Sequence, residues 1–207
     1  PLASLVERET RGEAKLELTM PDHFAVGTSV QVTPRLKVNA DLKFTRWSLW
    51  DDLAVNYSEP LGVLLITSLV QPDAAPPPLG QNMVLHMGLE DTWNVALGFE
   101  YQWNDQLALR LGVEDRPSSI PADKRSPVLP IGDSTLYALG AEYKASDKQI
   151  FSFAVATMQS SFSMPGNTSE LGNSEDPTKL IYNPYSGNDI EASLDVLLFE
   201  ASYRFAF

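Results

Sequence analysis

The sequence has no cysteine, only two histidines and few basic residues. Its 207 residues contain 15 Lys and Arg against 27 Asp and Glu, which gives a formal net charge of -12. Without cysteine, the chain can form neither a disulfide framework nor a thiolate site. It also lacks the basic stripe that neutralises phosphates, and this argues against a nucleic-acid partner.

Long apolar runs are absent as well. No stretch of about 18 consecutive apolar residues occurs, so the sequence predicts no transmembrane helix. No secretory signal precedes Pro1. If the protein is exported, we expect the signal, together with more of the chain, to lie upstream of Pro1.

The sequence shows no pattern typical of an enzyme. The histidines, His23 and His86, have no neighbours at metal-ligand spacing. No G-x-S-x-G nucleophile motif is present, and the isolated glycines Gly62 and Gly88 make no phosphate-binding loop. We therefore predict no catalytic residue, no metal site and no cofactor.

The clearest positive signal lies between Thr92 and Glu114. Apolar and polar residues alternate strictly along it, break at Asn104-Asp105, and then alternate again. Period-two alternation is typical of a strand, and an Asn-Asp pair between two such runs indicates a tight hairpin. The apolar side comprises Trp93, Val95, Leu97, Phe99, Tyr101 and Trp103, followed by Leu107, Leu109, Leu111 and Val113.

The composition of the two sides indicates the environment of this hairpin. The apolar side ends in aromatic residues, whereas the other side is small or charged. An apolar exterior with aromatic ends and a polar interior, over strands of about ten residues, is typical of a transmembrane β-barrel. The alternative is one hairpin of a soluble β-sandwich, in which the apolar side would be buried.

Similar alternation recurs along the chain and predicts about eight strands. The other alternating segments are residues 13–20, 23–33, 36–44, 135–145, 149–162 and 190–207. Tight turns at Pro34-Arg35, Asn104-Asp105 and Ser146-Asp147 alternate with long loops near 51–91, 115–134 and 163–189. Outer-membrane barrels have short periplasmic turns and long outer loops. We therefore predict an all-β fold, a single antiparallel transmembrane β-barrel domain over 1–207, in the bacterial outer membrane.

Several motifs resemble those of the long-chain fatty acid transporters of the outer membrane, a family that includes aromatic hydrocarbon transporters. The hairpin from Leu89 to Arg116 leads into a loop with a Pro, an Arg and further Pro residues, namely Pro121, Arg125, Pro127 and Pro130. The segment from Gly12 to Trp50 is similar too, with its Met20-Pro21-Asp22 and Thr45-Arg46-Trp47-Ser48 motifs. The chain ends in Tyr203-Arg204-Phe205-Ala206-Phe207, which resembles the recognition signal of the barrel assembly machinery.

This resemblance implies a fold and a function. It implies that these residues form the carboxy-terminal half of a fourteen-stranded barrel, with an amino-terminal half and its plug elsewhere. Family members often carry an Asp-Arg pair before the strand that follows the loop. This chain has Gly132-Asp133-Ser134 there and so lacks that arginine.

The charged residues on the polar sides of the strands are the candidate site. A basic residue facing lipid costs about 2–4 kcal/mol near the bilayer midplane, so we expect these residues to face the interior. A cation among them could bind a fatty carboxylate while apolar groups hold the tail, at about 0.8 kcal/mol per buried methylene. The candidate ligand-binding residues are Arg110, Lys144, Arg204, Glu100 and Glu142. The alternative is that these charges pair across strands and contact no ligand.

These observations predict a passive uptake channel for long-chain fatty acids or similar hydrophobic compounds, in contact with outer-membrane lipid. The apolar run from Leu61 to Leu69 could provide an outer landing groove for such a tail, or it could pack on itself as a loop. Two alternatives stay open. A general porin would conduct polar solutes and bind no fatty acid, and a soluble all-β binding module would need no detergent.

Overall fold

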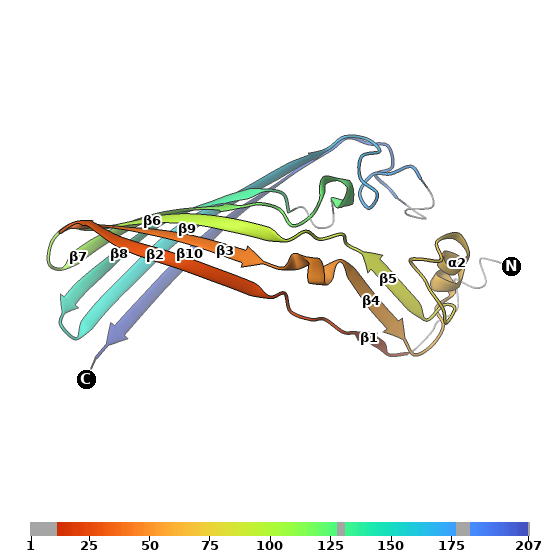
Figure 1. The fold of residues 1–207 in the computed structure, drawn as a ribbon, viewed down its shortest axis with the longest axis horizontal. Helices are drawn as coiled ribbons and strands as arrows, with labels where there is room; N and C mark the ends of the chain where they lie inside the picture. The colour runs from red at the N-terminus through yellow and green to blue at the C-terminus, as the bar shows by residue number, and fades with distance from the viewer. Residues whose placement is uncertain (1–11, 128–130, 177–182, 207) are drawn as a thin grey trace.

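The fold is a long seven-stranded antiparallel sheet with a small three-stranded sheet beyond one end (Figure 1). The computed structural model describes residues 12–127, 131–176 and 183–206. The large sheet has the order β10-β9-β8-β7-β6-β3-β2. Its strands are β2 (His23–Thr33), β3 (Leu36–Thr45), β6 (Thr92–Gln102), β7 (Leu107–Arg116), β8 (Ser134–Ser146), β9 (Gln149–Met164) and β10 (Ile190–Phe205). The prediction of an all-β antiparallel fold is confirmed.

The small sheet corrects the prediction of a loop at 51–91. It has the order β1-β4-β5, and its strands are β1 (Ala14–Leu16), β4 (Asp52–Tyr57) and β5 (Asn82–His86). Helix α2 (Gly62–Val70) connects β4 to β5. Strands of five and six residues are too short to produce sustained alternation, so sequence pattern alone does not reveal them. Residues 13–20, predicted as one strand, contain only the three residues of β1.

The helical elements are short. Besides α2, the described part of the chain contains two 3-10 turns, η1 (Trp47–Trp50) and η2 (Ala122–Lys124). In the part of the chain that the structure describes, no helix combines the length and hydropathy needed to cross a bilayer.

The alternating side chains of the large sheet point to two distinct faces. We call the side that carries Leu97 and Phe99 the outer face, and the side that carries Glu100 and Arg110 the inner face. The residues that a soluble sandwich would bury are exposed, with Phe99 at 40% and Leu111 at 51%. Within the described residues no second sheet covers them, so the outer face of this part of the chain is an unpartnered apolar surface.

Aromatic side chains border the outer face at both ends. Phe24, Phe44 and Trp93 are opposite one another on β2, β3 and β6, and the rings of Phe44 and Trp93 lie 4.9 Å apart. At the other end, Phe151 and Tyr203 form a second pair at 4.9 Å. Trp93 and Tyr101 are eight residues apart on β6, about 26 Å along the strand at 3.3 Å per residue. This span is close to the apolar band of about 25 Å of an outer-membrane barrel.

The connections are sorted by length between the two ends of the sheet. The tight turns β2–β3, β6–β7 and β8–β9 lie together at one end, and the small sheet, α2 and the long connections lie at the other (Figure 1). Each tight turn is capped by a side-chain oxygen that accepts backbone N–H groups. Thr33 accepts from Leu36 at 3.0 Å, Asn104 from Leu107 at 2.9 Å, and Ser146 from Lys148 at 3.3 Å. We call these the turn end and the loop end.

On strands β9 and β10, the apolar and the polar face change places near the loop end. Each has 16 residues, against 10 or 11 in β2, β3, β6 and β7. Beyond Val155 and Leu197 the outer face becomes polar, with Thr157, Gln159, Ser161, Asp195, Ser193 and Glu191. The inner face becomes apolar there, and Phe162 and Met164 are buried at 6% and 1% exposed. The extended hairpin therefore resembles a soluble one whose apolar side faces inward.

The two long connections at the loop end pack on this extended hairpin and on each other. Asn173 is fully buried, and its side-chain amide donates to the carbonyls of Met164, Pro165 and Asn188 at 3.2, 2.7 and 2.7 Å. Lys124 of η2 pairs with Glu170 of the later connection. These contacts join the described residues of the two connections and place most of the buried residues of the described chain at the loop end.

Candidate functional site

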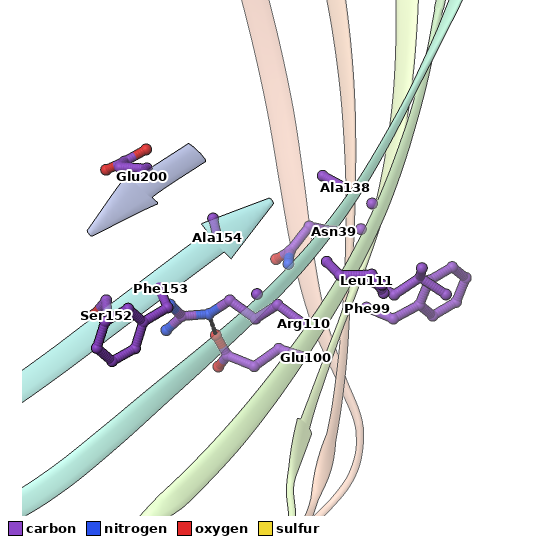
Figure 2. A pocket seen from close by; sticks show the side chains of 14 residues that line it. Asn39, Phe99, Glu100, Arg110, Leu111, Ala138, Ser152, Phe153, Ala154 and Glu200 are labelled. Carbon is purple, nitrogen blue, oxygen red and sulfur yellow. Dashed lines mark hydrogen bonds and ion pairs between the residues drawn. The ribbon is translucent and has the colours of Figure 1, made fainter. Parts of the chain in front are cut away.

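The inner face carries a row of charges that crosses four strands. Lys37 on β3 pairs with Glu100 on β6 at 3.1 Å. Arg110 on β7 donates through Nε to Glu100 at 2.7 Å and through Nη2 to Glu142 on β8 at 2.9 Å. Figure 2 shows Arg110 and Glu100 on the side of the strands opposite to Phe99 and Leu111. We call Lys37, Glu100, Arg110 and Glu142 the charge row.

Strand register explains why the row forms. Lys37 is directly opposite Glu100, and Glu100 is directly opposite Arg110. The residue opposite Arg110 on β8 is Gly140, so no side chain blocks the guanidinium from reaching Glu142 diagonally. Ser152, opposite Glu142 on β9, extends the row with a hydroxyl that donates to the Glu142 carboxylate at 3.5 Å.

The row is electrically balanced. Its two cations face two carboxylates, and the Arg110 side chain is 42% exposed. Ion pairs with this exposure contribute about 0–1 kcal/mol each to stability. Because two carboxylates accept hydrogen bonds from Arg110, its positive charge is already compensated.

A hollow of about 390 Å³ lies beside the charge row. Its lining runs from Asn39 on β3 to Glu200 on β10, which are five strands apart and so about 24 Å apart along the sheet. One hollow can include both residues only if the inner face is concave. Small residues at inward positions form much of the lining, namely Gly98, Gly112, Ala138, Gly140 and Ala154. Figure 2 shows Ala138 and Ala154 among them.

An apolar strip connects this hollow to the loop end. Inward-facing residues of β8, β9 and β10 form it: Leu136, Met158, Leu194, Val196 and Leu198. Met158 is directly opposite both Leu136 and Val196, so these three lie in one cross-strand row. Leu198 is 49% exposed and the others are half-buried. The inner face thus has a charged part that runs from β3 to Glu142 on β8, and an apolar part on β8–β10 toward the loop end.

The structure brings together three of the five predicted ligand-binding residues. Arg110, Glu100 and Glu142 are all members of the charge row. Lys144 lies at the turn end, where it pairs with Asp147 at 3.1 Å. Arg204 lies near the end of β10, does not line the hollow, and has no ion pair to another residue within the described ranges. A ligand-binding role for these five residues stays a prediction.

The sequence prediction missed the small residues that shape the hollow. Gly and Ala at inward positions were visible as a feature of the polar side, but only register shows that Gly98 and Gly112 are directly opposite each other. A Cβ atom at Gly112 would lie 3.8 Å from Ala138 Cβ, an ordinary contact, so nothing forces glycine there except the space it leaves open. Glu200 also lines the hollow and was not among the predicted site residues.

The predicted outer landing segment is helical. Residues 62–70 form α2, so the prediction of a loop there is wrong. Leu64 is buried, whereas Val63 and Leu69 are 55% and 78% exposed. Gly80, with φ of +77°, lies against Leu65, where a Cβ atom would come within 2.9 Å of that side chain. The helix therefore packs on residues near Gly80 and exposes an apolar side at the loop end.

His86 ends β5 rather than lying in a loop. Its Nδ1 lies 2.6 Å from Asp52 Oδ1, and its Nε2 lies 3.3 Å from the carbonyl oxygen of Asp73. Within the described ranges, no group of three or more His, Asp or Glu residues is arranged to hold a metal ion.

Comparison with known proteins gives consistent results. Residues 3–207 match the family described as outer membrane protein transport protein (OMPP1/FadL/TodX). Outer membrane protein P1 of Haemophilus influenzae is 28% identical over 143 residues, covering 69% of this chain and 26% of that protein. The long-chain fatty acid transport protein of Escherichia coli K12 is 25% identical over 128 residues, covering 62% and 24%. The chain thus matches about a quarter of the length of these curated relatives.

Solved structures show the same fold. A Pseudomonas aeruginosa FadL homologue aligns with a TM-score of 0.64 at 20% identity, over 93% of this chain and 37% of that one. The monoaromatic hydrocarbon channel TodX, as a deltaS2 mutant, aligns with a TM-score of 0.63 at 17% identity, over 95% and 38%. The predicted β-barrel fold is therefore confirmed.

Proposed function

Because this chain belongs to the outer membrane protein transport protein family (OMPP1/FadL/TodX), we propose that it contributes to passive uptake of hydrophobic compounds across the outer membrane. The compounds would be long-chain fatty acids, as in the name of the Escherichia coli relative, or aromatic hydrocarbons, as in the name of TodX. The protein is an outer-membrane protein, as its relatives are named.

The observation that carries this proposal is the apolar strip on a face that is otherwise polar. A water-filled pore has no need for Leu194, Val196 and Leu198 on its inner wall. A molecule with an apolar body gains about 25 cal/mol for each Å² of apolar surface that it removes from water there. The strip leads from the loop end to the hollow, which gives such a molecule a continuous apolar wall to follow.

The exposed side of α2 would be the first contact. Val63 and Leu69 lie at the loop end, on the outer side of the membrane band defined by the aromatic residues. We propose that a hydrophobic compound partitions onto this helix before it enters. This is the role that the sequence suggested for Leu61–Leu69, now carried by a helix instead of a loop.

The five predicted ligand-binding residues take different proposed roles. Glu100, Arg110 and Glu142 would keep the charged part of the wall hydrated and hold three strands in register through their ion pairs. Lys144 and Arg204 would contact a polar head group only at the turn end, where a compound leaves. Phe207 lies outside the described residues, and its recognition by the barrel assembly machinery stays a proposal.

The second candidate function, a porin for polar solutes, is supported by the charge row. The two candidates differ in what crosses the membrane. The test is uptake of radiolabelled laurate and toluene into liposomes that contain the full-length protein, alongside single-channel ion conductance. We expect uptake of at least one hydrophobic probe above empty liposomes, and little steady ion current. Large ion conductance with no hydrophobic uptake would favour the porin.

A steric variant ties the result to the hollow. Gly112→Phe should place its ring in the hollow without a backbone clash, since a Cβ at this site makes only ordinary contacts. We expect hydrophobic uptake to fall at least about fivefold, which corresponds to about 1 kcal/mol. The matched control is Ala141→Phe on the outer face of β8, which adds the same ring toward lipid and should leave uptake unchanged.

A further inference from the structure

The charges that line the hollow are not those that a carboxylate ligand needs. Arg110 is the one cation among the lining residues of the described chain. Two carboxylates, Glu100 and Glu142, already accept from its Nε and Nη2 atoms at 2.7 and 2.9 Å. A fatty carboxylate that approached the remaining Nη1 group of this guanidinium would lie close to both carboxylates, and like charges repel.

Other cations of the inner face do not compensate. Lys37 pairs with Glu100 at 3.1 Å, and Lys144 pairs with Asp147 at the turn end. Arg204 is four residues beyond Glu200 on the same face of β10, about 13 Å along the strand, and is not part of the lining. Lys43, on the same face of β3, is four residues and about 13 Å beyond Asn39 and is also absent from the lining. Arg110 is therefore the only cation that lines the hollow from the strands described here.

One carboxylate at the hollow has no counter-charge. Glu200 projects from β10 on the side of the hollow away from the Arg110–Glu100 pair (Figure 2). Its row neighbours across β9 and β8 are Ala154 and Gly140, which offer neither charge nor hydrogen-bond donor through their side chains. No hydrogen bond or ion pair joins the Glu200 carboxylate to another residue within the described ranges. The charge row is neutral, so Glu200 gives the hollow a net negative charge.

We propose that this hollow accepts uncharged hydrophobic molecules and discriminates against carboxylates. The inference rests on the proposed uptake function and specifies its substrate class. An uncharged compound gains apolar contacts with the small residues that line the hollow and with Leu198 and Val196 of the adjoining strip. It gains them without an electrostatic penalty. A fatty carboxylate gains the same contacts but must lie near Glu200, and like charges repel more strongly in a partly desolvated hollow than in bulk water.

The test compares one hydrophobic body with and without its charge. Radiolabelled laurate and methyl laurate are equilibrated at neutral pH with the full-length protein in detergent, and binding is measured by gel filtration with correction for micelle partition. The extra methyl group alone favours the ester by about fourfold. We expect the ester to bind at least about twentyfold more tightly. In Glu200→Gln, laurate affinity should rise at least about threefold while the ester affinity stays the same.

A matched control separates this charge from the general acidity of the protein. Asp195→Asn removes a carboxylate from the same strand but on the outer face, so the laurate to ester ratio should stay as in the unmodified protein. Laurate binding as tight as the ester, or a ratio unchanged by Glu200→Gln, would overturn the inference while leaving hydrophobic uptake intact. If neither ligand binds and ions pass freely, the proposed function fails and this inference fails with it.

Discussion

The two halves of the β9–β10 hairpin follow the same alternation with opposite sign. Near the turn end, Phe199 faces outward and Glu200 faces inward. Near the loop end, Asp195 faces outward and Phe162 is buried on the inward side. One continuous pair of strands thus satisfies two different surroundings. The alternation shows that two faces exist, and only the surroundings determine which face is apolar.

The difference marks where the apolar surroundings end. From Val155 and Leu197 toward the turn end, the outer face is apolar and requires lipid or another apolar covering. From there toward the loop end, the outer face is compatible with water, and residues of the described connections cover the inward side chains of Phe162 and Met164. This exchange of apolar and polar faces therefore marks the loop-end edge of the apolar band on β9 and β10. It does so independently of the aromatic residues on β3 and β6.

The largest expected effect is a destabilisation of β9 and β10 in their turn-end half. Phe199→Arg puts a charge on the outer face within the apolar band and should lower the free energy of unfolding in lipid by about 2–4 kcal/mol. Ser193→Arg lies on the same face of the same strand but on the loop-end side of the boundary. It should change the free energy of unfolding by less than about 0.5 kcal/mol. Urea unfolding of the full-length protein in liposomes measures both. Equal effects of the two substitutions would show that no boundary lies between them.

The second effect is a destabilisation of the loop-end half. Asn173→Ala removes the amide that donates to three carbonyls in a fully buried position. Loss of buried hydrogen bonds should destabilise this region by about 1–3 kcal/mol. Because the region lies outside the apolar band, we expect faster proteolysis and hydrogen exchange in 165–189 with little change in the strands. Loss of the whole barrel instead would mean that the two halves fold as one unit.

The third effect concerns the charged part of the inner face. Arg110→Met leaves Glu100 and Glu142 without their shared partner and should cost about 1 kcal/mol or less. In the double variant with Glu142→Gln, part of that loss should be recovered, and a double-mutant cycle on unfolding free energies gives the coupling. If Arg110→Met also lowers laurate affinity more than methyl laurate affinity, Arg110 binds the carboxylate and its pairing with Glu100 and Glu142 is not its only role.

The smallest effect is at the junction of the two sheets. Asp91, just before β6, accepts from the backbone N–H of Ser48 in η1 at 2.9 Å, and this bond lowers the pKa of Asp91 below its ordinary value. A carboxyl with a lowered folded pKa stabilises above its unfolded pKa, and the contribution is lost as the pH falls through the folded value. We expect the Ser48 amide to lose hydrogen-exchange protection only when the pH falls below the ordinary range of an aspartate carboxyl. Asp91→Asn should remove this pH dependence, and its persistence would assign it to another group.

Sequence pattern predicts the large sheet well, for a physical reason. In each strand between lipid and water, the alternation of an apolar with a polar residue repeats about five times. Leu97, Phe99 and Leu111 could therefore be assigned to the outer face without coordinates. Strands β4 and β5 repeat the alternation only two or three times, and the apolar run of α2 has no clear period. These elements were therefore predicted as loop.

The candidate site is less predictable because it depends on register. Glu100 and Arg110 could be placed inward from alternation alone. That Arg110 reaches Glu142 diagonally over Gly140 depends on the pairing of β7 with β8, in which Arg110 is opposite a residue 30 positions later in the sequence. The hollow depends in the same way on small residues from four strands that coincide at one level. Pairing between distant segments is not encoded in any single stretch of sequence.

The strand order has a directional consequence. Seven strands that alternate in direction leave β2 and β10, the two edges, pointing the same way. If these edges met, their pairing would be parallel, and two identical sheets side by side in one orientation would meet in parallel at both seams. In lipid every edge must be hydrogen-bonded. A wall with antiparallel neighbours throughout therefore closes only when an odd number of further strands, beginning and ending in the opposite direction, spans from β10 back to β2.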